Sequence, residues 1–217
     1  MERQFVGLIG DVVGSRRLGP SARDDLQGRI RRTLDEINER FSSSISAKFL
    51  ITIGDEFQGL LQDPVVLPEL IRALEMGLPH TILRLGIGRG AIHTGLADYA
   101  IGMDGPAWHA AREALTQARA SRRLGGVFMG FGESEDRILN GFARVLHHIR
   151  ARLTEKQRVL LEALLGNGTQ SGVAARTGVT KQAVSKQALA AGLDAYREGE
   201  GAWKLVLIET RTAPSRP

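Results

Sequence analysis

The sequence predicts an α+β fold, in which a βαββαβ core is followed by an all-α segment with a helix-turn-helix. In the N-terminal part, short apolar runs alternate with patterns typical of amphipathic helices. After Glu135 the strand signals nearly stop. The C-terminal part then places two short helical patterns on either side of a glycine-containing turn. We therefore expect two domains, residues 1–150 and residues 151–217.

The first half of the core begins with a nearly continuous apolar run at residues 5–13, which predicts a buried strand. A helix is expected from Ser21, because apolar residues recur every three or four positions at Leu26, Ile30, Leu34, Ile37 and Phe41. Residues 48–53 and 57–61 then flank Gly54-Asp55-Glu56, and a Gly-Asp pair between two strand-like runs indicates a hairpin.

The second half repeats the alternation. Asp63-Pro64 starts the next helix, and residues 83–87 form the next strand. Another helix begins at Gly105-Pro106 and turns Trp108 toward the core, and residues 127–129 make a last short strand. This order is that of a ferredoxin-like βαββαβ core with additions.

Composition excludes several classes of protein. Of the 217 residues, 42% are apolar and 24% charged, which is an ordinary globular mixture. Cysteine is absent, which excludes disulfide scaffolds, thiol nucleophiles and zinc fingers. No apolar run approaches the roughly 18 residues of a membrane span, and the N-terminus opens no signal peptide. We expect a soluble, cytoplasmic protein with no membrane partner.

The formal net charge of +5 is unevenly distributed. Residues 151–217 contain ten Lys and Arg against six Asp and Glu, whereas residues 1–150 are nearly neutral. This excess of positive charge favours a polyanionic partner for the C-terminal part.

The C-terminal part contains the pattern of a helix-turn-helix. A short helix over residues 170–176 is followed by the turn Thr177-Gly178-Val179-Thr180 and a second helix over residues 181–190. We expect Val179, Val184 and Leu189 to fill the core beneath. The expected outward side chains suit DNA bases and phosphates, and they are Lys181, Gln182, Ser185 and Lys186. The alternative is a structural bundle or a protein-docking module. The segment resembles the helix-turn-helix of sigma-factor region 4.

Two carboxylates of the N-terminal part are candidates for a metal site. Asp11 ends the first strand and Asp55 lies on the hairpin, so neighbouring strands would bring them together. Two convergent carboxylates suit Mg²⁺, which often bridges to nucleotide phosphates. A phosphate would be bound by the Gly14-Ser15 backbone, with Arg16 or Arg17 beside it. The alternative is that these are ordinary turn and strand-end residues.

Four segments carry a resemblance to class III nucleotidyl cyclases and, more distantly, to the GGDEF catalytic domains of diguanylate cyclases. Asp11 and Asp55 fall where the metal aspartates of that family lie, Arg84 to Gly95 is similar to its R-x-G-I-H-x-G strand, and Gly105 to Arg112 resembles its G-P-x-V-N-x-A-x-R helix. The resemblance implies that Arg112 binds phosphates. It departs at the asparagine that orients the ribose, because Trp108 or His109 stands there.

Taken whole, the chain resembles the SatD family of bacterial proteins through L-I-G-D-V-V-G-S-R, G-D-E-F-Q-G-L and G-M-D-G-P-A-W-H-A-A-R-E-A-L. Together these observations favour a homodimeric, DNA-binding transcriptional regulator whose cyclase-like domain binds a Mg²⁺-nucleotide. The alternative is an active nucleotidyl cyclase or another metal-dependent enzyme acting on nucleoside triphosphates. Whether the protein is an enzyme stays open, and a third hypothesis is a catalytically inactive scaffold.

Overall fold

A five-stranded sheet organises the N-terminal part of the computed structural model, which describes residues 2–166 and 168–212. The order is β2-β3-β1-β4-β5, and every neighbouring pair is antiparallel except β4 and β5. The strands are β1 (Phe5–Val12), β2 (Ile45–Ile53), β3 (Glu56–Leu61), β4 (Leu83–Gly90) and β5 (Val127–Met129). The first four strands have the order and directions of a ferredoxin-like sheet, so the predicted α+β class is confirmed.

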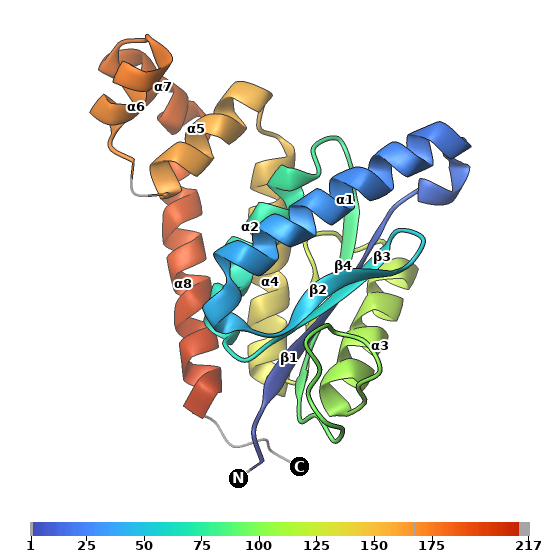
Figure 1. The fold of residues 1–217 in the computed structure, drawn as a ribbon. Helices are drawn as coiled ribbons and strands as arrows, with labels where there is room; N and C mark the ends of the chain where they lie inside the picture. The colour runs from blue at the N-terminus through green and yellow to red at the C-terminus, as the bar shows by residue number, and fades with distance from the viewer. Residues whose placement is uncertain (1, 167, 213–217) are drawn as a thin grey trace.

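Helices cover both faces of the sheet (Figure 1). The face that carries Val6, Leu8 and Leu85 packs against α1 (Pro20–Arg40), α2 (Leu67–Gly77) and α4 (Glu133–Ala151). The opposite face packs against α3 (Pro106–Ser121). The buried Trp108 lies there, as the sequence predicts.

Glycines on β4 allow α3 to approach the sheet closely. A Cβ at Gly86 or Gly88 would collide with the backbone of α3, and one at Gly90 would lie 2.7 Å from the backbone nitrogen of Ala107. The alternating glycines of this strand therefore set the distance between the helix and the sheet.

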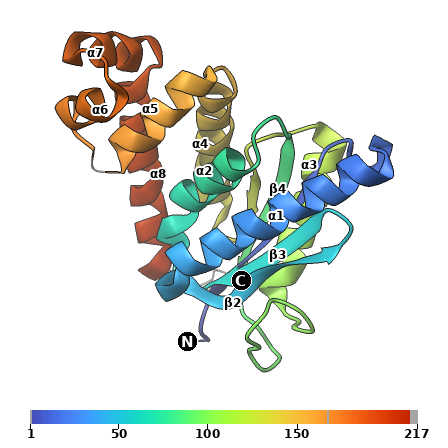
Figure 2. The same cartoon turned by 45° about the horizontal axis from the view of Figure 1, so that its top comes forward.

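The C-terminal part is helical, with α5 (Glu155–Leu165), α6 (Gln170–Thr177) and α7 (Lys181–Ala190) grouped away from the sheet (Figure 2). The last helix, α8 (Leu193–Thr212), returns along α4. Its fully buried Trp203 lies edge-on to Phe128 of β5, with the ring centroids 5.5 Å apart. The hydrophobic core thus continues across residue 150, and a division into two domains at that residue stays a prediction.

No helix within residues 2–166 and 168–212 combines the length and the apolar character needed to cross a bilayer.

Candidate functional site

The C-terminal end of the central strand β1 and the turn of the β2–β3 hairpin lie at the same end of the sheet. Gly10 pairs with Phe57 of β3, so Asp11 and Val12 run beside the hairpin turn. Gly54 takes a φ of 65° in that turn, a conformation that glycine adopts without strain. The backbone N–H of Val12 donates to Asp55 Oδ2 at 2.8 Å. The side chain of Asp55 is therefore fixed against the residue that follows Asp11.

Two arginines hold the buried Asp11 carboxylate. Arg84 lies opposite Asp11 on β4, and its Nε donates to Oδ1 at 2.8 Å. Arg119 comes from α3, and its Nε donates to Oδ2 at 2.8 Å. Both oxygens of Asp11 are thus engaged by guanidinium groups, while the aspartate side chain is only 8% exposed.

Glu56 continues the same network toward solvent. Arg112 Nη1 lies 2.9 Å from each Glu56 oxygen, and Arg119 Nη2 lies 3.2 Å from Oε2. Partial burial lowers the pKa of Arg119, but its hydrogen bonds and charge interactions with Asp11 and Glu56 raise it by more, so the net shift is upward. We call Asp11, Asp55, Glu56, Arg84, Arg112 and Arg119 the carboxylate–arginine cluster; its formal charges balance.

In this pairing the carboxylate–arginine cluster does not fit a cation. The oxygens of Asp11 face arginines, and no group of three His, Asp or Glu suited to a metal ion occurs among the residues that the structure describes. The structure thus does not show the magnesium site expected at Asp11 and Asp55, and that site stays a prediction.

The phosphate-binding residues expected beside Asp11 lie in the short 3-10 turn that follows β1. Gly14 has a φ of 80°, Ser15 is buried, and Arg16 and Arg17 are exposed. Among the described residues, no hydrogen bond or ion pair joins Arg16 or Arg17 to the carboxylate–arginine cluster. The structure brings Arg112 into the cluster through Glu56 instead.

Sequence reasoning did not assign the pairings of Arg84, Arg119 and Glu56. One signal was available for Arg119, because it follows Arg112 by seven residues and so lies on the same face of α3. Nothing in the sequence shows that this face meets the end of β1, since Asp11 and Arg119 are 108 residues apart.

The helix-turn-helix forms as expected. Thr154 caps α5 in a capping box with Gln157, and Gly178 ends α6 in the left-handed conformation with a φ of 68°. Thr180 then caps α7 by accepting a hydrogen bond from the backbone N–H of Ala183 at 3.2 Å. The buried residues between these helices include Val173, Ala174, Val184 and Ala188.

All four side chains predicted to contact DNA are exposed on α7, namely Lys181, Gln182, Ser185 and Lys186. Two core predictions are wrong, because Val179 is 45% exposed and Leu189 is 78% exposed. Val184 and Ala188 are one helical turn apart and face inward, so Leu189 is rotated about 100° away from the core. Val179 lies in the turn before the N-cap, outside the helix.

Comparisons with solved structures give remote likenesses. The guanylyl cyclase domain of the RhoGC fusion protein from Blastocladiella emersonii is 15% identical, with 53% of this chain and 75% of that chain covered and a TM-score of 0.39. A bacterial light-regulated adenylyl cyclase is 14% identical, with 55% of this chain and 72% of that chain covered and a TM-score of 0.38. The regulator of polyketide synthase expression from Bifidobacterium adolescentis is 16% identical, with 96% and 85% covered and a TM-score of 0.30. These scores are too low to support a conclusion.

None of the curated proteins compared with the chain matches it. The family model described as "SatD family" matches residues 5–206, which include both the sheet and the helix-turn-helix. The chain belongs to the SatD family.

Proposed function

We propose that the protein is a transcriptional regulator that binds DNA through α7. The observation that carries this proposal is the exposed face formed by Lys181, Gln182, Ser185 and Lys186 directly after a tight turn. In a helix-turn-helix the second helix enters the major groove, and its N-terminal residues contact base edges. Gln182 is suited to read an adenine, whereas the lysines and Ser185 suit phosphates and bases.

The charge around α7 supports the same proposal. No acidic residue occurs from Ala163 to Leu193, so nothing in this stretch repels a phosphate backbone. Arg176 of α6 is exposed and adds a further positive charge. The N-terminal end of a helix also carries a partial positive charge from its backbone N–H groups.

We also propose that two copies act together, because a single helix-turn-helix usually reads one half of a two-part site.

For the N-terminal part we propose a nucleotide as the ligand of the carboxylate–arginine cluster, where guanidinium groups suit phosphates. Arg84 and Arg119 donate hydrogen bonds to Asp11, so these hydrogen bonds would have to break before the two arginines could bind a phosphate.

The geometry gives no observation that favours the alternative, an active nucleotidyl cyclase. At the position of the ribose-orienting asparagine, Trp108 is buried in the core. His109 is exposed and its Nε2 lies 2.9 Å from Asp104 Oδ1.

Selection from a random duplex DNA library tests the proposal without a known operator. The full chain is used to enrich sequences, and binding of the selected and of scrambled duplexes is compared by fluorescence anisotropy. We expect one preferred motif, and Gln182→Ala should reduce the discrimination by about 1–3 kcal/mol. Lys48→Gln, an exposed change on β2, is the control and should leave the discrimination unchanged. Enrichment of no motif, with equal binding to all duplexes, would refute sequence-specific regulation.

A further inference from the structure

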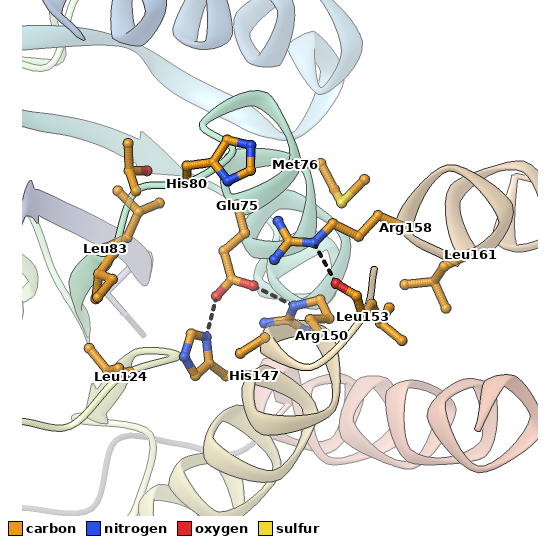
Figure 3. A pocket seen from close by; sticks show the side chains of 13 residues that line it. Glu75, Met76, His80, Leu83, Leu124, His147, Arg150, Leu153, Arg158 and Leu161 are labelled. Carbon is orange, nitrogen blue, oxygen red and sulfur yellow. Dashed lines mark hydrogen bonds and ion pairs between the residues drawn. The ribbon is translucent and has the colours of Figure 1, made fainter. Parts of the chain in front are cut away.

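A cavity of about 330 Å³ lies where the sheet-containing part of the chain meets α5, the helix that precedes the helix-turn-helix (Figure 3). One wall comes from α2 and the loop that leads into β4. The other wall comes from the end of α4, from Leu153 and from α5. A ligand in this cavity would therefore contact both parts of the chain.

The lining of the cavity is amphipathic. Its apolar side chains include Met76, Leu83, Leu124, Leu153 and Leu161. Its ionisable side chains are Glu75, His80, His147, Arg150 and Arg158, which give a formal charge of +1 with the histidines neutral. Ligand sites combine an apolar lining with a few polar groups in this way, and their volumes begin at about 300 Å³.

The one carboxylate of the lining is already satisfied. Glu75 Oε1 lies 2.8 Å from His147 Nδ1, and Oε2 accepts from Arg150 Nε at 2.5 Å. Burial raises the pKa of Glu75, but the charge of Arg150 and the hydrogen bonds from His147 and Arg150 lower it by more, to about 2. Glu75 is thus ionised and paired, and it leaves no carboxylate to neutralise a second cation.

Donors of two arginines remain unused. Arg150 has a side chain that is only 4% exposed; Nη1 donates to the Tyr196 hydroxyl at 2.7 Å, while Nη2 has no hydrogen-bond partner among the described residues. Arg158 donates from Nε to the Leu153 carbonyl at 3.4 Å. Within the described part of the chain it forms no ion pair, and Figure 3 shows its guanidinium reaching from α5 toward Glu75.

We propose that this cavity binds a small organic acid, with its carboxylate on Arg158 and its apolar body against the leucines. An arginine offers a carboxylate two parallel hydrogen bonds, and the partly buried site strengthens them. The apolar wall favours an acid that carries a hydrocarbon group over inorganic phosphate, which would leave that wall uncovered. His80, which lines the cavity from the loop before β4, has a φ of 62°, a conformation uncommon outside glycine.

Occupancy of the cavity would also affect α7. Leu153 leads into α5, and Arg158 and Leu161 belong to it. Because α5 packs against both helices of the helix-turn-helix, α6 and α7, a ligand would bias how these helices are held against α2 and α4. This regulatory part rests on the proposed function, whereas binding of the acid does not.

Titration calorimetry of the full chain without DNA tests the binding itself. The probes are octanoate and phenylacetate, their neutral amides, and inorganic phosphate. We expect at least one acid to bind, and to bind at least tenfold more tightly than its amide and than phosphate. Arg158→Gln should weaken that binding about 10- to 100-fold, because a charge-assisted contact is lost. Arg152→Gln, the exposed neighbour at the end of α4, is the matched control and should leave the binding unchanged.

A second variant tests the apolar wall. Met76→Phe places a bulkier side chain in the cavity and should weaken the acid and the amide alike. Circular dichroism and the unfolding midpoint establish that each variant is folded. Binding of no acid, equal binding of acid and amide, or full binding by Arg158→Gln would each overturn the proposal. Acid binding by a protein that fails to bind DNA would refute the proposed function and leave this inference standing.

Discussion

Replacement of Asp11 by Asn tests whether the carboxylate–arginine cluster stabilises the end of β1. The change keeps the size of the side chain but removes the charge that Arg84 and Arg119 share. Arg84 then has no acidic partner among the described residues, while Arg119 keeps only its 3.2 Å contact with Glu56. We therefore expect the folded state to be destabilised.

The magnitude follows from the contacts and their exposure. A hydrogen bond to a charged group contributes about 1.5–3 kcal/mol, and each arginine donates at least one to Asp11. The arginine side chains are 24% and 39% exposed, so water replaces part of what they lose, and the asparagine oxygen still accepts one bond. We expect the free energy of unfolding to fall by about 2–3 kcal/mol.

Urea unfolding at pH 7, followed by circular dichroism, measures this change. The midpoint should fall by about 1 M with an unchanged slope. Asp55→Asn is the matched control: its amide oxygen can still accept from the N–H of Val12, so the loss should stay below about 1 kcal/mol. A midpoint for Asp11→Asn equal to that of the parent would refute the stabilising role of the cluster.

Three further predictions follow from the structure. The pKa of Glu75 is about 2 in the folded protein, against an ordinary 4.5, so this group stabilises the folded state by about 3 kcal/mol above pH 4.5. That stabilisation is lost as the pH falls through about 2. Unfolding free energies of the parent and of Glu75→Gln, measured between about pH 5 and pH 2, check this, and parallel curves for the two proteins would contradict it. Trp203→Ala should cost about 3–5 kcal/mol and still unfold in one transition, because Trp203 belongs to a core shared by α8 and β5; two separate transitions, by circular dichroism and fluorescence, would show independent domains. Light scattering at tens of micromolar should give twice the mass of one chain, and a monomer with and without DNA would count against paired half-site reading.

Helices and strands could be predicted where apolar residues or glycines recur at a regular spacing, or where a known turn signal joins two strands. The apolar spacing of α1, the hairpin around Gly54-Asp55 and the alternating glycines of β4 each determine a local structure within a few residues. The fold class and the helix-turn-helix follow from the order of these elements.

Partners that are distant in the sequence were not predictable. Asp11 could be recognised as a polar residue that ends a buried strand, but its arginines come from β4 and α3, and no periodicity connects them. In the same way, α8 looks like any amphipathic helix, and its return to Phe128 through Trp203 depends on tertiary packing. Even within one helix the sequence did not predict which side chains are buried. Leu189 is exposed although it adjoins the buried Ala188, because a shift of one position in a helix turns a side chain from the core to solvent.

The central claim, that α7 binds DNA, is tested most directly by the salt dependence of binding. Affinity of the full chain for its selected duplex is measured by anisotropy between about 50 and 200 mM salt, for the parent and for Lys181→Gln combined with Lys186→Gln. If both lysines contact phosphates, the double variant should bind more weakly and its log–log slope should be shallower by about two units. The matched control, Lys48→Gln with Arg31→Gln, removes the same charge from β2 and α1 and should keep the parent slope. Equal slopes for the parent and the Lys181 and Lys186 variant would contradict the account.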